Sequence, residues 1–174
     1  LTVLGISELL DELRSSEDRV RYRSKIQLRE FGRSAIIEKI DPWLASLDKN
    51  DEAYDQHRLE ALWVCQQFHH VHERLLEELL TSGNEDVRAA ATRVLYYWNG
   101  MIPGVEDRLI KMSRDSSPRV RLEAAVSLSH FKTESSVSAL LATIEYPVDY
   151  YHYYALNEAF KYLRPVWSEM FRKN

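Results

Sequence analysis

The stretch DVRAAATRVLYYW at residues 86–98 decides the fold, because variants of it recur along the chain. A close copy, PRVRLEAAVSLSHF, occupies residues 118–131, and three weaker copies lie elsewhere. The copies are anchored on Arg21, Arg58, Arg88, Arg121 and His152, with steps of 37, 30, 33 and 31 residues. A period of this size is typical of a solenoid built from two-helix units.

Four columns of the repeat share one helical face and predict the core. They lie one position before the anchor and three, seven and ten positions after it, which is helical spacing. The first column is Val20, His57, Val87, Val120 and Tyr151. The last column is aromatic in every copy: Phe31, Phe68, Trp98, Phe131 and Tyr162. These columns place Tyr151 and Tyr162 in the core of the fifth copy.

A second set of apolar helices lies between these copies. The expected helices are Ile6 to Leu13, Ala35 to Leu47, Glu73 to Leu80, Glu106 to Met112 and Val137 to Ile144. No segment shows the alternation of a strand. The sequence therefore predicts an all-α fold, an α-α superhelix of about five helical hairpins.

We expect a single domain over residues 1–174. Its predicted repeat units are 3–32, 34–70, 72–99, 104–132 and 135–164, followed by a short capping helix at 165–172. The chain lacks an initiator Met, so we expect it to be a fragment of a longer protein.

Composition excludes several classes of protein. Of the 174 residues, 45% are hydrophobic and 29% are charged, as in a globular domain. No apolar run is long enough to span a membrane, and a single cysteine excludes an internal disulfide. The formal net charge of −4 argues against binding nucleic acid through a broad basic stripe.

The pattern Asp/Pro-x-Val-Arg-x-x-Ala-Ala-x-x-x-Leu resembles the second helix of a HEAT repeat. The resemblance covers nearly the whole chain. It implies that these helices line an inner, concave face, and that the domain is a protein-binding scaffold and not an enzyme.

A narrower resemblance rests on LEALWV at 59–64, on the stretches 87–98 and 118–124, and on the closing Tyr154-Ala155-Leu156 with Leu163-x-Pro165-x-Trp167. These are similar to the HEAT region of large exported bacterial proteins that carry a sugar-dehydrogenase-like propeller and a haem-binding cytochrome c-like module. That family implies an extracytoplasmic scaffold between redox modules. This chain has no Cys-x-x-Cys-His, so we expect no haem or other cofactor in it.

We predict no catalytic residue and no metal ligand. Cys65 shares a column with Leu28, Leu95 and Leu128, so a buried, inert thiol is expected. The cluster His69, His70 and His72 falls at a helix junction, and its ligand set is incomplete for a metal. No nucleophile elbow, phosphate loop or metalloprotease motif is present.

The anchor arginines are interpreted as structural. Arg21, Arg58, Arg88 and Arg121 could form a basic ladder, but the nearby acids Asp18, Glu85, Asp86 and Asp115 favour pairing within the stack.

Two polar columns, three and ten positions after the first core column, form the candidate binding face. Together with the aromatic C-terminal end, they give the candidate partner-binding residues Arg23, Glu60, Gln67, Tyr97, Glu123, His130, Tyr153, Tyr154 and Lys161. The mixed charges suit a protein surface or a neighbouring domain of the same polypeptide, and no nucleic acid is expected. The C-terminal aromatic residues are open to two interpretations. They pack, either as a cap on the solenoid end or against a following domain, or they form a ligand groove.

Two alternative functions come from other classes. One is a nucleic-acid-binding protein similar to the HEAT-like DNA glycosylases, which would need basic residues in the inner columns. The other is a HEAT-like lyase subunit that handles a chromophore, which would need a pocket with a positioned acid or nucleophile. The sequence offers only Arg23 and Lys161 for the first and no such group for the second.

Overall fold

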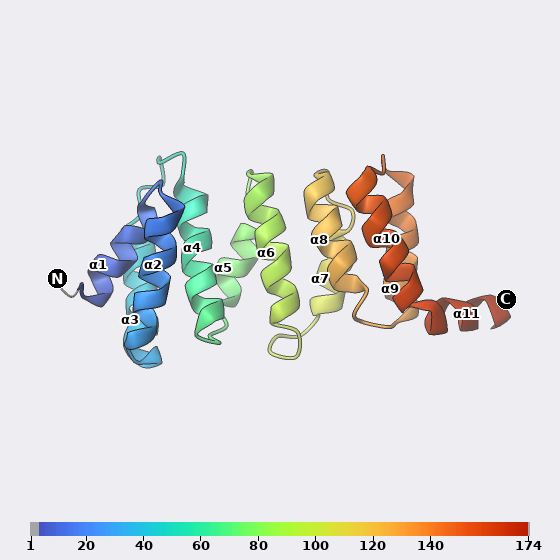
Figure 1. The fold of residues 1–174 in the computed structure, drawn as a ribbon, viewed down its shortest axis with the longest axis horizontal. Coiled ribbons are helices and arrows are strands. Elements are labelled where there is room, and N and C mark those ends of the chain that lie inside the picture. Colours follow the sequence, from blue (N-terminus) through green and yellow to red (C-terminus); the bar gives the residue numbers. More distant parts are fainter. Residues whose placement is uncertain (1–3, 174) are drawn as a thin grey trace. The chain divides into compact units, whose positions relative to one another are not determined.

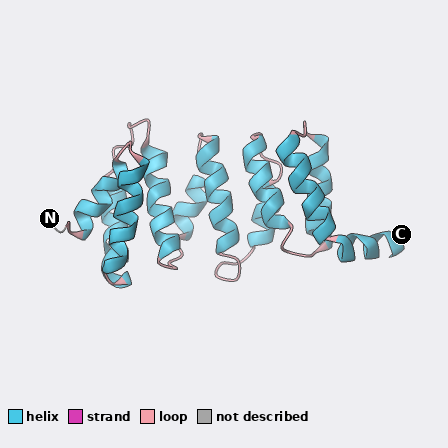
Figure 2. Ribbon diagram, in the orientation of Figure 1, coloured by secondary structure: helices cyan, strands magenta, loops and turns pink. Residues whose placement is uncertain are grey.

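The computed structural model describes residues 4–173, and these are all-α, which confirms the predicted fold class (Figures 1 and 2). The α-helices are α1 Ile6–Asp11, α2 Asp18–Gln27, α3 Arg33–Ala45, α4 Tyr54–Gln67, α5 Glu73–Leu79, α6 Glu85–Tyr97, α7 Val105–Met112, α8 Pro118–Leu128, α9 Glu134–Ala142, α10 Tyr150–Tyr162 and α11 Arg164–Lys173. Short 3-10 turns are η1 Glu12–Arg14, η2 Leu28–Glu30 and η3 Thr143–Glu145. No β-strand occurs between residues 4 and 173.

The chain divides into two compact units, Leu1–Leu79 and Leu80–Asn174, here called unit 1 and unit 2. Unit 1 contains α1 to α5, and unit 2 contains α6 to α11. The single-domain organisation expected from the repeats stays a prediction.

In unit 1 the helices α2 and α4 carry repeat copies, and α1, α3 and α5 pack against them. The α1 helix begins with a capping box in which Glu8 accepts a hydrogen bond from the Gly5 amide at 2.7 Å. The Trp43 indole of α3 donates to Asp11 of α1 at 3.1 Å. This hydrogen bond ties α1 to α3 over a core that includes Leu9, Ile36 and Ile40.

In unit 2 the repeat helices α6, α8 and α10 are successive neighbours, and α7 and α9 lie behind them (Figure 1). Asn84 caps α6 by accepting from the amides of Asp86 and Val87, and Pro118 occupies the first turn of α8. We call α6, α8 and α10 the inner helices of unit 2.

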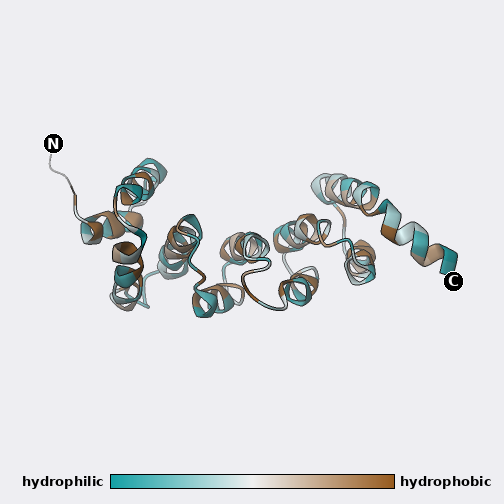
Figure 3. Cartoon of the chain, turned by 90° about the horizontal axis from the view of Figure 1, so that it is seen from below, coloured by the Kyte–Doolittle hydropathy of each residue, from teal (hydrophilic) through white to brown (hydrophobic). Residues whose placement is uncertain are grey.

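The predicted core columns are buried in α6 and α8. Val87, Ala91, Leu95 and Trp98 are almost inaccessible to solvent, and so are Val120, Ala124 and Leu128. The small alanines let the two helices approach closely. The helices of both units carry hydrophobic as well as hydrophilic residues (Figure 3). Packing within each unit supplies the buried surface that no hairpin has alone.

The fifth repeat copy departs from its predicted register by one residue. Tyr151 and Tyr162, expected in the core, are 70% and 56% exposed. Their neighbours His152 and Leu163 are buried instead, and Leu156 is buried in place of Ala155.

The helix cap explains this correction. Asp149 caps α10, so His152 is the third residue of the helix. The core valines Val87 and Val120 stand at the same third position after their caps, Asn84 and Ser117. The cap therefore sets which face of the helix enters the core, and the shifted register leaves two phenol rings in solvent.

Candidate functional site

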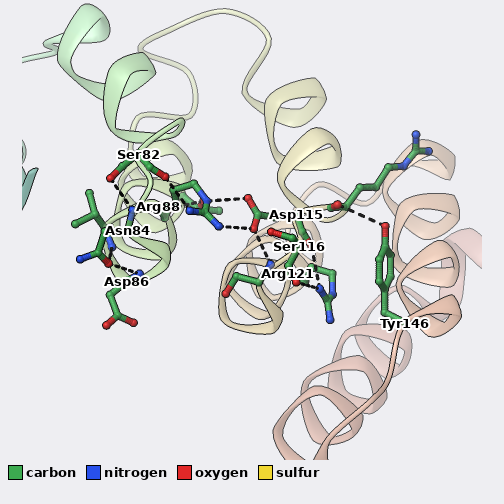
Figure 4. A network of polar contacts seen from close by, with 12 residues as sticks. Ser82, Asn84, Asp86, Arg88, Asp115, Ser116, Arg121 and Tyr146 are labelled. Atoms are coloured by element: carbon green, nitrogen blue, oxygen red, sulfur yellow. Dashed lines mark hydrogen bonds and ion pairs between the residues drawn. The ribbon is translucent and has the colours of Figure 1, made fainter.

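The anchor arginines of unit 2 are held inside the stack, in agreement with the structural interpretation. Arg88 binds both carboxylate oxygens of Asp115, at 3.0 and 2.9 Å, and donates to the Ser82 carbonyl at 2.8 Å (Figure 4). Arg121 donates to the carbonyls of Asp115 and Ser116, both at 2.8 Å, and lies over the Tyr146 ring. These guanidinium groups connect one helical hairpin to the next.

Pairing also changes the pKa of both Arg88 and Asp115. Partial burial alone would raise the pKa of Asp115, but hydrogen bonds from Arg88 and the Ser117 amide outweigh it, so this pKa lies below its ordinary value. The hydrogen bond to Asp115 raises the pKa of Arg88. Both groups are therefore charged at neutral pH, which fits a structural ion pair.

The arginines of unit 1 are paired in the same way. Arg21 donates to the Ser15 carbonyl at 2.6 Å and to Glu60 at 3.0 Å, and it also pairs with Asp18. Arg58 pairs with Asp55 at 3.1 Å and with Glu78. A free basic ladder is thus absent from the anchor positions.

A groove of about 450 Å³ opens on the inner helices of unit 2. Its walls are formed by Arg93, Tyr96, Tyr97, Leu122, Glu123, Val126, Ser127, His130, Tyr151, Tyr154 and Ala155. Four of the candidate residues from the sequence come together here, namely Tyr97, Glu123, His130 and Tyr154. We call this feature the aromatic groove.

Aromatic rings form a continuous run across the three inner helices. Tyr97 and Tyr96 of α6 have ring centroids 5.8 Å apart, and Tyr96 lies 5.0 Å from His130, which follows α8. His130 in turn lies 6.1 Å, edge to face, from Tyr162 of α10. Separations of this size are those of interacting aromatic pairs, so each ring supports the next.

One ion pair crosses the groove. Arg93 of α6 binds Glu123 of α8 through two guanidinium nitrogens and both carboxylate oxygens, with Nε 3.0 Å from Oε2. Its hydrogen bond to Glu123 raises the pKa of Arg93. The positive charge of Arg93 and the negative charge of Glu123 therefore neutralise each other in the wall of the aromatic groove.

Glu60 requires a correction. The polar column placed it on the binding face, but it is only 1% exposed. Its carboxylate is enclosed by Arg21 at 3.0 Å and Lys25 at 2.7 Å. It is therefore a buried structural carboxylate that a partner cannot reach.

The remaining candidate residues lie outside the aromatic groove. Arg23 is exposed on α2, and Gln67 at the end of α4 donates to the Lys25 carbonyl at 2.9 Å. Lys161 and Tyr153 are exposed on α10, where Lys161 pairs with Glu158 at 2.6 Å. Whether any candidate residue contacts a partner stays a prediction.

The sequence missed several groove residues. Tyr151 and the neighbouring Tyr162 were assigned to the core through the one-residue register error, and Tyr96 stood in no predicted column. The Asp149 cap was the sequence feature that could have corrected the first two. No pattern in the sequence marked Tyr96.

A larger hollow of about 770 Å³ lies in unit 1. Most of the charged side chains in its walls are already paired internally. Arg58 binds Asp55 and Glu78, Arg74 also binds Glu78, and His72 lies 2.9 Å from Asp41. Such a lining favours a solvated polar surface over a ligand site.

The cysteine and the two column histidines are buried in structural positions. Burial raises the pKa of the Cys65 thiol to about 12, so it is not a nucleophile at neutral pH. His57 and His152 are buried against Asp51 and Asp149. Among residues 4–173, no group of three or more His, Cys, Asp or Glu side chains is arranged to hold a metal ion. Nor does any helix in this range have the length and hydropathy needed to cross a bilayer.

Comparison with known proteins gives one family. A family model for HEAT repeats matches residues 72–159, about half of the chain. No curated protein matches the chain. The matched range contains every residue that lines the aromatic groove.

Proposed function

Because this chain belongs to the HEAT-repeat family, we propose that it is a non-catalytic docking scaffold that binds its partner in the aromatic groove of unit 2. HEAT repeats generally serve as scaffolds for protein interactions, and their domains are typically non-catalytic. The observation that carries the proposal is the exposure of the groove rings. Tyr97 is 56% exposed although it stands in a run of mutually supported aromatic residues.

Two properties support a docking role for this groove. Tyrosine is enriched where surfaces are buried by partners, because it adds a large contact area and a hydroxyl with few rotatable bonds. The rings are also held in place before binding by their contacts with one another, which lowers the entropy lost on association. Tyr97, Tyr154 and Val126 together offer an apolar surface that folding leaves uncovered.

We further propose that the partner is a neighbouring module of the same polypeptide. This follows the resemblance to exported proteins with dehydrogenase-like and cytochrome-like modules, in which the HEAT region would hold redox modules together. The sequence that flanks this chain tests the placement. A signal peptide upstream and a Cys-x-x-Cys-His downstream would support it, whereas flanking modules of another kind would contradict it.

Binding of the flanking modules, measured by calorimetry, tests the use of the groove. We expect Tyr97→Ala to weaken binding about tenfold or more, as removal of a central aromatic contact does. Tyr22→Ala is the matched control, because Tyr22 is similarly exposed on α2 of unit 1 and does not line the groove. Equal affinities for the wild type and Tyr97→Ala would overturn the proposal.

A further inference from the structure

We propose that α2 of unit 1 carries a second docking surface, which binds an acidic amphipathic helix of a partner protein. The surface, here called the α2 stripe, consists of Arg19, Tyr22, Arg23 and Ile26. Their spacing of i, i+3, i+4 and i+7 places them on one side of the helix. The inference is independent of the aromatic groove, which lies in unit 2.

The cations of the α2 stripe have no carboxylate partner among residues 4–173. Arg19 and Arg23 are exposed and form no ion pair in this range, in contrast to Arg21 and Arg58 of the same unit. Between residues 19 and 29 the sequence holds five cations and no acid, although the formal net charge of the chain is −4. The stripe is therefore a local excess of positive charge, which complements an acidic partner.

Two apolar side chains lie between these cations. Tyr22 is 65% exposed and Ile26 is 40% exposed, so the fold of unit 1 leaves much of both uncovered. Cations and apolar groups on one side of a helix complement the acidic and apolar side of an amphipathic helix. A phosphate backbone would satisfy the arginines but has no apolar group to cover Ile26, which favours a protein helix over nucleic acid.

The α2 stripe has an equivalent in the next repeat helix, α4. Arg23 corresponds to Glu60 in the repeat alignment, whose step is 37 residues here. Ile26 corresponds in the same way to Trp63. In α4 these two columns contact the preceding helix, because the Lys25 amine of α2 lies 2.7 Å from Glu60 and 4.9 Å from the centre of the Trp63 ring. The columns thus form a helix-binding surface in α4, and the same surface is open in α2.

The sign of the charges identifies the partner of the α2 stripe. In the contact between α2 and α4, two cations one helical turn apart, Arg21 and Lys25, converge on the carboxylate of Glu60 at 3.0 and 2.7 Å. At the α2 stripe the sign is reversed, because Arg23 is the cation. Two carboxylates at i and i+4 of a partner helix therefore converge on the Arg23 guanidinium group, which has five N–H donors.

Anisotropy titrations of the full chain with fluorescein-labelled synthetic peptides test this inference, in about 0.15 M salt to screen distant charges. The probe is a capped, alanine-rich helix of about 18 residues with glutamates at i and i+4 and leucines at i+3 and i+7. A second peptide has glutamine in place of both glutamates, and a third has the glutamates on the side opposite the leucines. A fourth contains a central proline that breaks the helix. A single-stranded DNA oligonucleotide is the nucleic-acid probe.

We expect the first peptide to bind most tightly and the other three peptides to bind about tenfold more weakly, since each loses the paired charges or the helix that presents them. Arg23→Glu should weaken binding of the first peptide about tenfold, because it places an acid opposite acids. Ile26→Ala should weaken it about fivefold through lost apolar contact. Arg172→Glu is the matched control and should leave binding unchanged, because Arg172 is an exposed arginine of α11 that also forms no ion pair among residues 4–173.

A charge exchange separates a lost contact from a damaged fold. The Arg23→Glu chain should prefer a peptide that carries lysines in place of the two glutamates, whereas the wild type should prefer the glutamate peptide. Circular dichroism should be the same for both chains, since Arg23 is exposed. An unchanged preference in the Arg23→Glu chain would overturn the inference.

Three further outcomes would overturn it. They are no binding of the first peptide, equal affinity for its glutamine version, and tighter binding of the proline peptide or the DNA. Dimerisation of the chain that Arg23→Glu abolishes would assign the stripe to a second copy instead.

The α2 stripe and the aromatic groove can be tested separately. Tyr97→Ala should leave binding of the acidic peptide unchanged, because Tyr97 belongs to the groove. Tyr22→Ala should weaken binding of this peptide about tenfold and leave the groove untouched. Failure of the peptide to bind would therefore not affect the docking proposal for unit 2, and failure of that proposal would not affect the stripe.

Discussion

Units 1 and 2 differ in how far the side chains of the same two repeat columns are buried. In unit 1, Glu60 and Gln67 face the preceding repeat helix and bond to it, Glu60 to Arg21 and Lys25 and Gln67 to the Lys25 carbonyl. In unit 2 the equivalent positions hold Glu123 and His130, with Tyr97 in the copy before, and they border an open groove. The repeat thus fixes the position of a side chain. The type of side chain at that position decides whether it is enclosed within the fold or open to a partner.

The largest expected difference between the units concerns their equivalent glutamates. Glu60→Ala removes a buried carboxylate from two partly buried cations, and we expect the free energy of unfolding to fall by about 3 kcal/mol. Glu123→Ala breaks a pair whose arginine is 62% exposed, and we expect a loss below about 1 kcal/mol. Urea unfolding followed by circular dichroism measures both, and equal losses would contradict the contrast.

The second comparison is between two ion pairs of unit 2, the partly buried Arg88–Asp115 pair and the exposed Asp86–Arg119 pair. We expect Asp115→Asn to cost about 2 kcal/mol at pH 7, because a charge-assisted pair becomes a neutral contact. The pKa of Asp115 is lowered in the folded chain, so the pair stabilises above the ordinary aspartate pKa and loses this effect as the pH falls through the folded value.

The difference in stability between the wild type and Asp115→Asn should therefore shrink below about pH 4. Unfolding curves from pH 7 to pH 3 measure it. Asp86→Asn is the control, because Asp86 pairs with Arg119 at the surface and should cost less than about 1 kcal/mol. A difference that grows with acidity would contradict the assigned shift.

A smaller difference in the free energy of unfolding is expected between Gln67→Ala and Tyr97→Ala, which change residues of the same repeat column. Gln67→Ala removes a hydrogen bond to the backbone and should cost about 1 kcal/mol. Tyr97→Ala should change the free energy of unfolding by no more than about 0.5 kcal/mol, since the ring is largely exposed. A large loss for Tyr97→Ala would mean that the ring is structural and would weaken its assignment to binding.

The last and smallest effect concerns the chemical reactivity of the Cys65 thiol, which lies in the core of unit 1. At pH 8 the folded chain should not react with a thiol-specific disulfide reagent over minutes, because the thiol is buried and its pKa is about 12. The chain unfolded in urea should react at once, which serves as the control. Rapid labelling of the folded chain would show that unit 1 opens locally.

Most of the fold could be predicted from the sequence, because the repeat columns impose helical spacing on apolar residues. Val87, Ala91 and Leu95 are buried as expected. The prediction failed in the fifth copy, where His152 was aligned with the arginines. The helix cap, and not the identity of the anchor residue, fixes the rotation of α10.

The candidate site was only partly predictable, since column position does not reveal pairing. Glu60 and Glu123 share a column, yet one is buried and the other borders the aromatic groove. Their difference depends on Lys25 and Arg21, which lie 35 and 39 residues before Glu60. Such distant pairings are set by packing between repeats, which a local pattern does not encode.

The arginine contacts to backbone carbonyls also bear on where the chain can change in length. Arg21, Arg88 and Arg121 each donate to a carbonyl six residues earlier, in Ser15, Ser82 and Asp115. A residue added within any of these three spans would break the contact, so their length is fixed. The steps between anchors nevertheless vary from 30 to 37 residues. Insertions, circular permutation or the grafting of extra repeats should therefore be tolerated in exposed parts of the other connections, such as residues 48–53 and 99–101, and not in front of the repeat helices.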